Sequence, residues 1–260
     1  MRELERDLVH PTHAAIAIVG PGRAGSSLAR AAEGAGLQVT LAGREDALDA
    51  CRGADAALLC VPDDAIVGAG AACATLGEEM PGLVGHVSGA STLEVLEAAA
   101  EAGAATFSMH PLQTFPDGRA AVAGMPCAVA GSSQGALGFA TDFATALEMR
   151  PFEVAEESRA AYHAAASIAS NLLVALEESA AELLSRAGVS DARELLAPLV
   201  LQTAANWVER GPEALTGPIA RGDAATVERH WQAISEIAPE LLPAYEALAE
   251  RAAAGRGAVA

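Results

Sequence analysis

Short apolar runs alternate with polar, glycine-containing segments over the first half of the chain. Runs of this length, bounded by Gly, Pro, Asp or Ser, are typical of buried strands. The pattern predicts six strands, over residues 14–19, 37–42, 55–61, 83–87, 104–109 and 126–130, and a helix of small residues over 26–35. Strands that alternate with helices predict an α/β fold built on a doubly wound parallel sheet.

The strand pattern ends after residue 155. From 156 to 187 the chain contains neither Gly nor Pro, and residues 160–176 carry no charge. Polar side chains such as Tyr162 and Ser170 interrupt this stretch and argue against a membrane span, so we expect one long helix that is buried on most sides. Further helices are predicted at about 191–210, 223–238 and 239–253. The chain is therefore expected to comprise an α/β domain over residues 1–155 and an all-helical domain over residues 156–260.

A glycine-rich turn follows the first predicted strand. Residues 20–25 have the spacing G-x-G-x-x-G and lead into a helix. In this setting Gly20 allows a tight turn, Gly22 lets the backbone approach a pyrophosphate, and Gly25 lets the helix lie close to the strand. The free N–H groups at the start of the helix then face the phosphates. The pattern predicts a Rossmann domain whose dinucleotide-binding loop consists of Gly20, Pro21, Gly22, Arg23, Ala24 and Gly25.

The residue that follows the second predicted strand bears on the choice between NAD and NADP. An NAD site usually places Asp or Glu there to accept from the ribose hydroxyls, whereas an arginine suits the 2′-phosphate of NADP. Arg44 occupies this place and favours NADP(H). The alternative is that Arg44 is a solvated loop residue and that Glu45 or Asp46 binds the ribose.

Several candidate binding residues follow predicted strands directly. In a parallel doubly wound sheet, ligands lie beyond the carboxyl ends of the strands. Val61, Pro62 and Ser88 are expected there and are assigned to the cofactor, while Gln113 is assigned to the substrate. His110 also follows a strand and is a candidate either to donate to substrate or to cap a neighbouring loop.

Composition narrows the partners and the chemistry. A net charge of −18 and a pI near 4.6 argue against nucleic acid or an anionic membrane as the main partner. The chain contains 16 residues counted as Lys+Arg and all are arginines, which excludes lysine Schiff bases and Walker A loops. The four cysteines lack metal-binding spacing, and no metal site is predicted. Reduced cysteines and an N-terminal stretch without an apolar region indicate a cytoplasmic protein.

These features together resemble a known group of enzymes. The GPGRAG loop, the arginine after the second strand, the Val61-Pro62 turn, His110-Pro111 and an all-helical second half are similar to NADP-dependent oxidoreductases with a helical dimerisation domain. This group includes pyrroline-5-carboxylate reductase, ketopantoate reductase, 6-phosphogluconate dehydrogenase and prephenate dehydrogenase. Residues 108–115, 162–163 and 216–223 more closely resemble a Rossmann-like family whose helical domain was named without a known function. The resemblance implies a 6-phosphogluconate-dehydrogenase-like helical domain, and the apolar helix predicts a homodimer.

The proton donor is the main departure from the group, because hydroxyacid dehydrogenases and ketopantoate reductases generally use a lysine that this chain lacks. Histidine is the simplest replacement near neutral pH. A helix turns by about 100° per residue, so His163, Ser167 and Asn171 fall in one polar stripe of the predicted long helix. We predict His163 as the donor, with His110 and Asn171 as further catalytic candidates and Ser167 at the substrate; helix–helix hydrogen bonding is the alternative role of the stripe.

The leading hypothesis is an NADPH-dependent reductase of a small, carboxylate-bearing oxo or imino compound. Oxo acids such as ketopantoate rank ahead of cyclic imines such as pyrroline-5-carboxylate. Arg221 is a candidate for a bidentate pair with the carboxylate, and a surface ion pair with Asp223, the predicted N-cap of the next helix, is the alternative. The rival hypothesis is a non-catalytic module that senses NADP(H) and regulates a partner.

Overall fold

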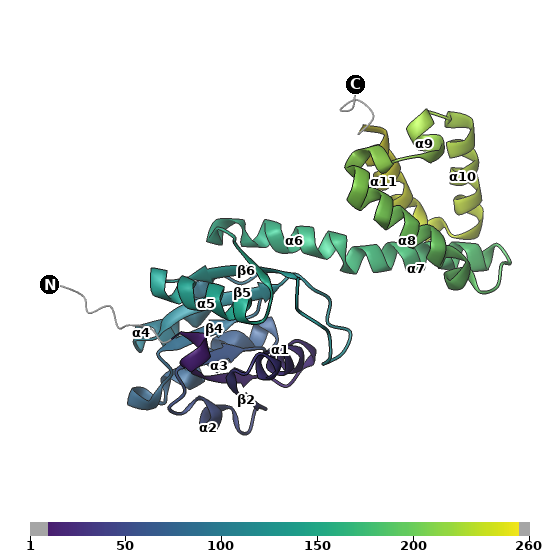
Figure 1. Ribbon diagram of the computed structural model, residues 1–260. Helices are drawn as coiled ribbons and strands as arrows, with labels where there is room; N and C mark the ends of the chain where they lie inside the picture. The colour runs from purple at the N-terminus through teal and green to yellow at the C-terminus, as the bar shows by residue number, and fades with distance from the viewer. Residues whose placement is uncertain (1–9, 255–260) are drawn as a thin grey trace. The chain divides into compact units, whose positions relative to one another are not determined.

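The computed structural model describes residues 10–254 (Figure 1). The chain divides into two compact units, one that ends at Ser167 and one that begins at Ile168. The first unit contains every strand and the second is helical. The predicted fold class, a Rossmann-type α/β domain followed by an all-helical region, is confirmed.

A seven-stranded sheet forms the centre of the first unit, in the order β2-β1-β3-β4-β5-β6-β7. Strands β1 to β5 are parallel, and β1 lies between β2 and β3 where the winding direction reverses. This reversal is the place where doubly wound sheets bind their ligands. The strands are β1 (Ala15–Val19), β2 (Gln38–Ala42), β3 (Ala56–Leu59), β4 (Leu83–His86), β5 (Ala105–Pro111), β6 (Pro126–Gly131) and β7 (Arg150–Glu153).

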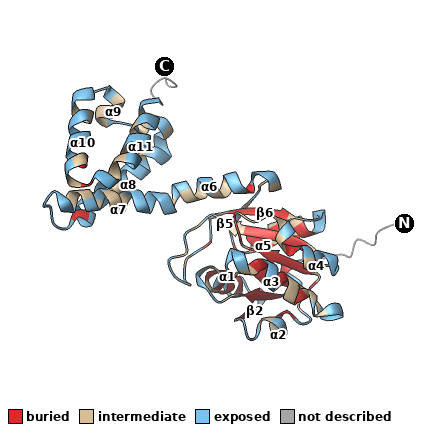
Figure 2. Ribbon diagram, turned by 180° about the vertical axis from the view of Figure 1, so that it is seen from behind, coloured by how far each residue is buried: buried red, intermediate tan, exposed pale blue. Residues whose placement is uncertain are grey.

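Helices cover both faces of the sheet. Successive strand side chains point to opposite faces, so Ile16 and Ile18 join one apolar cluster while Ala17 and Val19 join another. The first cluster is completed by α1 and α5, and the second by α2, α3 and α4. Figure 2 shows the resulting burial along the strands. These helices are α1 (Arg23–Gly34), α2 (Ala47–Cys51), α3 (Asp63–Ala74), α4 (Glu97–Glu101) and α5 (Gln134–Ala146).

The sequence pattern predicted a parallel sheet, and this prediction is wrong for one pair of strands. Strand β6 runs antiparallel to β5, because residues 112–125 return the chain without a crossover helix. The pairing places His110 opposite Ala128 and extends β5 through Pro111, so His110 lies within the strand rather than after it. A crossover through α5 then adds β7, parallel to β6, as a seventh strand.

The helical region begins differently from the prediction. Residues 156–187 do not form one helix: a 3-10 turn at Glu156–Ser158 precedes α6 (Arg159–Ala169), and α7 (Asn171–Arg186) follows a break. At Ser170 the backbone leaves the helical region, with φ −128° and ψ −78°. Ser170 is the N-cap of α7, although its side chain makes no capping hydrogen bond.

Three of the remaining helices agree closely with the predicted ranges: α8 (Ala192–Arg210), α10 (Ala224–Ile237) and α11 (Leu242–Ala254). The short helix α9 (Gly217–Arg221) was not predicted. Asp223 caps α10 as predicted, since its side chain accepts the Thr226 N–H. No helix among residues 10–254 is both long enough and apolar enough to cross a membrane.

The apolar side chains of α7 and α8 are exposed in the single chain, which corrects the prediction of a helix buried on most sides. Leu172 exposes 56% of its surface and Leu199 exposes 64%. Among the described residues of this unit, only Ala192, Ile234 and Ala238 are buried apolar residues. Figure 2 shows how little of the helical unit is buried.

Candidate dinucleotide and histidine site

The glycine loop joins β1 to α1 by a very close backbone approach. Gly20 has a φ of +109°, and a Cβ there would lie 2.4 Å from the carbonyl oxygen of Cys60. A Cβ at Gly25 would lie 2.0 Å from the carbonyl oxygen of Gly20. Both distances are far below van der Waals contact, so the fold itself requires glycine at these two positions.

Gly22 is different, because the fold alone does not require glycine there. Its φ of −72° suits any residue, and a Cβ would meet no heavy atom of the described chain within 4 Å. Gly22 is also the N-cap of α1, and no side chain among the described residues caps this helix end. The first turn of α1 therefore presents backbone N–H groups beside open space, which is the geometry that binds a pyrophosphate. These residues fit a dinucleotide.

The ends of β2 and β3 border the same loop. Gly43 lies near Pro21, since a Cβ on Gly43 would lie 3.9 Å from the proline Cγ. Arg44 follows Gly43 and is exposed, with no ion-pair partner in the part of the chain that the structure describes. On the β3 side, the Val61 side chain is the third-nearest neighbour of the Gly20 Cβ position, and Pro62 is the exposed N-cap of α3.

Ser88 organises the loop after β4. Its hydroxyl donates to Asp63 Oδ2 at 2.9 Å and accepts the Ser91 N–H at 3.0 Å. The hydroxyl also lies 3.0 Å from that of Ser91. These bonds occupy the Ser88 hydroxyl within the protein, so a cofactor would meet this loop mainly through its backbone. The assignment of Ser88 to the cofactor stays a prediction.

His86, at the end of β4, is fully buried and its tautomer is defined by its neighbours. Its Nδ1 accepts the Ser88 N–H at 3.1 Å, so the ring proton lies on Nε2, which donates to the Thr92 carbonyl oxygen at 3.3 Å. Burial and the nearby Arg159 lower the pKa of His86 to about 4. His86 is therefore a neutral structural residue of the loop.

His110, Tyr162 and His163 form a second cluster. His110 Nδ1 lies 2.7 Å from the Tyr162 hydroxyl, and the two imidazole ring centroids lie 5.9 Å apart. Gly89 lies against both imidazoles, because a Cβ there would lie 2.8 Å from the nearest atoms of each ring. The structure thus brings two of the predicted catalytic residues together, and adds Tyr162 and Gly89 to them.

The protonation of this cluster follows from its surroundings. Burial, His163 and Arg159 lower the pKa of His110 to about 4, and burial raises the pKa of Tyr162 to about 12. Near neutral pH the imidazole is uncharged and the phenol keeps its proton. A phenol is the better donor, so we assign the proton of the shared bond to Tyr162, which leaves the His110 proton on Nε2. Within residues 10–254 no acceptor binds Nε2 and no fully buried side-chain nitrogen lacks a partner, so Nε2 keeps some solvent access although it lies against Gly89.

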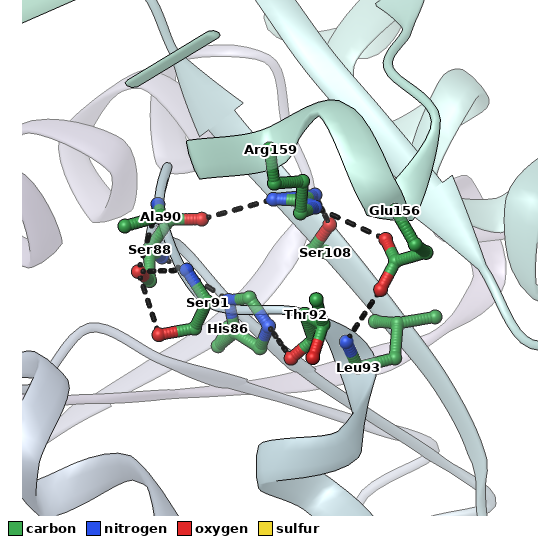
Figure 3. Close-up of polar contacts among 9 residues, drawn as sticks. All are labelled: His86, Ser88, Ala90, Ser91, Thr92, Leu93, Ser108, Glu156 and Arg159. Carbon is green, nitrogen blue, oxygen red and sulfur yellow. Dashed lines mark hydrogen bonds and ion pairs between the residues drawn. The ribbon is translucent and has the colours of Figure 1, made fainter. Parts of the chain in front are cut away.

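Arg159 is a central residue that the sequence patterns did not single out. It is 1% exposed and donates from Nη1 to the Ser88 carbonyl oxygen at 3.2 Å, from Nη2 to Ser108 Oγ, and from Nε to Glu156 Oε1 at 3.0 Å (Figure 3). A signal was present in the sequence, since Arg159 is the last charged residue before the uncharged stretch 160–176.

Other predicted residues lie outside this cluster or serve local structure. The Gln113 side chain donates to the Ala121 carbonyl oxygen at 3.0 Å and accepts the Thr114 N–H, so it shapes its own loop. Ser167 lies on α6. Asn171 and Arg221 belong to the helical unit; the break at Ser170 removes Asn171 from the helix of His163, so the stripe is not continuous.

Solved structures with the same fold include several oxidoreductases. A Bacteroides fragilis protein described as a candidate NADP oxidoreductase is 22% identical, with a TM-score of 0.76, covering 92% of this chain and 98% of its own. The NADP-bound pyrroline carboxylate reductase of Plasmodium falciparum is 17% identical, with a TM-score of 0.59 and coverage of 94% and 99%. The reductive aminase of Aspergillus terreus, in complex with NADPH and ethyl-5-oxohexanoate, is 17% identical, with a TM-score of 0.65 and coverage of 93% and 94%.

Sequence comparison identifies the second half of the chain. No curated protein sequence matches the chain significantly. Residues 125–252 match a family model described as a domain of unknown function, DUF2520. This agrees with the resemblance to a Rossmann-like family whose helical domain was named without a known function. The chain thus combines a Rossmann-type sheet with a segment, residues 125–252, that is similar to the DUF2520 family.

Proposed function

We propose that this chain is an NADP(H)-dependent oxidoreductase that reduces a small oxo or imino compound. The observation that carries the proposal is the contrast within the glycine loop. The fold requires glycine at Gly20 and Gly25, whereas at Gly22 it leaves open space that a ligand could occupy. A pyrophosphate beside the uncapped start of α1 would fill that space.

Arg44 supports NADP(H) over NAD(H). It is exposed, follows the strand that borders the glycine loop, and has no ion-pair partner among residues 10–254. A free guanidinium in this position suits the 2′-phosphate, with which it can make charge-assisted hydrogen bonds. The structural neighbours that bind NADP or NADPH support the same cofactor.

The histidine cluster supports reduction rather than binding alone. NADPH supplies a hydride, and a carbonyl or imine that accepts it also needs a proton on its oxygen or nitrogen. His110 offers a free Nε2–H, and His163 makes no side-chain hydrogen bond within residues 10–254. Both imidazoles can therefore donate to a substrate atom without breaking an existing bond. His163 remains our choice for the donor, with His110 orienting the substrate.

The substrate class is supported less directly. Two structural neighbours, a pyrroline carboxylate reductase and a reductive aminase, act on imino or oxo compounds, which favours that class here. Arg221 is exposed and forms no ion pair with Asp223 or any other described residue, so its guanidinium is free for a carboxylate. We propose 2-oxo acids and cyclic imino acids as the first compounds to test.

The exposed helical surface supports a homodimer. Large apolar residues on α7 and α8, including Val174, Leu195, Leu199 and Leu201, expose 59–72% of their surface. A helical unit with so few buried side chains does not have a core of its own, and exposed apolar area of this kind marks protein contacts. We propose that a second copy of the chain covers it.

A first prediction tests the dinucleotide loop. Gly22→Val is expected to abolish NADPH binding and to leave the thermal unfolding temperature nearly unchanged, because the new side chain fits the protein but occupies the pyrophosphate space. Titration calorimetry with NADPH and a melting curve provide the two measurements. Gly68→Ala is the control, since Gly68 on α3 also has open space around its Cβ position. Unchanged NADPH affinity in Gly22→Val would overturn the assignment of the loop.

A second prediction concerns the adenosine end of the cofactor. Arg44→Asp should weaken NADPH binding by roughly 10- to 100-fold, the equivalent of one or two charge-assisted hydrogen bonds, and should change NADH binding little. Dissociation constants for both cofactors decide the matter. An equal loss for NADPH and NADH would assign Arg44 a structural role.

A third prediction places the proton donor. His163→Gln should retain NADPH affinity and lower turnover of an accepted substrate by about 10²- to 10⁴-fold, the usual contribution of general acid catalysis. His110→Gln is the matched comparison from β5. If His110→Gln is inactive while His163→Gln is fully active, the donor is His110 on β5 rather than His163 on α6. Cofactor binding without turnover of any oxo acid or imine would favour the NADP(H)-sensing role instead.

A fourth prediction tests the dimer. Leu199→Glu should shift the protein from dimer to monomer in size-exclusion chromatography with light scattering, because a charge would be buried in the proposed contact. Leu48→Glu, at an exposed leucine of α2, should leave the dimer intact. A monomeric parent chain at micromolar concentration would contradict the proposal.

A further inference from the structure

Helix α6 docks on β5 through two polar contacts in matching register. Arg159 donates to Ser108, and Tyr162 binds His110. Alternate strand residues point to the same face and lie about 6.6 Å apart, while residues three apart on a helix share a face and lie about 4.5 Å apart along its axis. The two spacings are similar enough for both contacts to form at once. The register of α6 on β5 therefore fixes where His110 and His163 lie.

Arg159 also ties this register to the loop after β4. Its Nη1 donates to the carbonyl oxygen of Ser88, and its Nε pairs with Glu156, whose second oxygen accepts the Leu93 N–H at 2.7 Å (Figure 3). One guanidinium thus contacts the end of β4, the middle of β5 and the turn before α6. Gly89, which lies against both imidazoles, directly follows the Ser88 carbonyl that Arg159 holds.

We propose that Arg159 is a positioning residue of the candidate reductase: its buried guanidinium sets the register of α6 on β5 and thereby places His110 and His163 against the Gly89 backbone. This inference rests on the proposed function for its catalytic meaning. Its structural content, the control of the imidazoles by Arg159, can be measured without cofactor or substrate.

The charges around His110 support a direct electrostatic effect of Arg159. Burial is the largest cause that lowers the pKa of His110, followed by His163 and Arg159 on α6; His86 on β4 also lowers it, and Asp63 on α3 raises it. The charge of a buried guanidinium affects neighbouring titratable groups because little solvent screens it. A residue that served the fold alone would not change the titration of His110 in a variant that still folds.

The decisive experiment is a pH titration of the histidines in the full chain by imidazole ¹H–¹⁵N NMR. For the parent protein the titration should give His110 a pKa of about 4. In Arg159→Met the pKa should rise, because a nearby positive charge no longer opposes protonation, but stay below the ordinary imidazole range, because burial still lowers it. Arg159→Lys should keep the low pKa through its charge. Arg150→Met, at an exposed arginine that also donates to a carbonyl oxygen, is the control and should not move His110.

Measurements of turnover distinguish the effect of Arg159 on the register of α6 from the effect of its charge. Lysine cannot reach three acceptors at once, so Arg159→Lys should lower kcat by up to about 10²-fold while NADPH affinity stays near that of the parent. Ser108→Ala should act in the same direction, and the double variant should lose little more than Arg159→Lys alone, since both remove one contact.

The outcomes distinguish this inference from the proposed function. A His110 titration that is the same in the parent and in folded Arg159→Met, or independent effects of the Ser108 and Arg159 variants on kcat, would overturn the positioning role. If Arg159→Met fails to fold, the Arg159→Lys and Ser108→Ala pair still decides. Absence of NADPH binding in the parent chain would overturn the proposed function, while the titration would still decide whether Arg159 controls the imidazoles.

Discussion

The site depends on close backbone approach, which glycine alone permits. At the β1–α1 turn, Gly20 touches the end of β3 and Gly25 touches Gly20, so three elements meet without side chains between them. This contact orients the first turn of α1 toward the space beside Gly22. The same principle operates after β4, where Gly89 lets a backbone segment lie directly against His110 and His163. The proposed phosphate site and the proposed proton-transfer site therefore both depend on backbone segments that carry no Cβ.

A second constraint is electrostatic. The chain has a net charge of −18 but is proposed to bind an anionic cofactor, so any attraction must come from local groups. The start of α1 and Arg44 provide positive potential at one end of the candidate site, and Arg159 provides it beside the histidines. The charge of Arg159 is only partly balanced, because Glu156, its carboxylate partner among residues 10–254, keeps 38% of its side chain exposed. The positive charge is therefore felt by His86 and His110, whose pKa values it helps to lower.

The sequence predicted the features that depend on local patterns. Five of the predicted strands in the first unit can be recognised from an apolar run that ends at a turn residue. The G-x-G-x-x-G spacing likewise predicts the geometry of its loop. The direction of β6 was not predictable in this way, because it depends on a connection without a helix. The break at Ser170 was missed for a similar reason: absence of Gly and Pro shows that a helix is allowed, and packing decides whether it continues.

Within the site, the prediction found the individual histidines but not what holds them. His110 and His163 are far apart in the sequence, and their proximity depends on the register of α6 on β5. That register is set by Arg159, whose partners lie 51 and 71 residues away in the chain. Long-range polar contacts of a single buried residue leave no periodic pattern, so the sequence alone does not identify them.

The absence of lysine gives this arrangement its chemical interest. A lysine ammonium can donate a proton from almost any orientation, because its three N–H bonds rotate freely on a flexible stem. A neutral imidazole has one N–H in the plane of a rigid ring, and its tautomer must be fixed for that bond to point at the substrate. Tyr162 supplies this control at His110, and the register of α6 supplies the ring position. A site that replaces lysine with histidine thus needs a rigid polar support, and the buried Arg159 network meets that need.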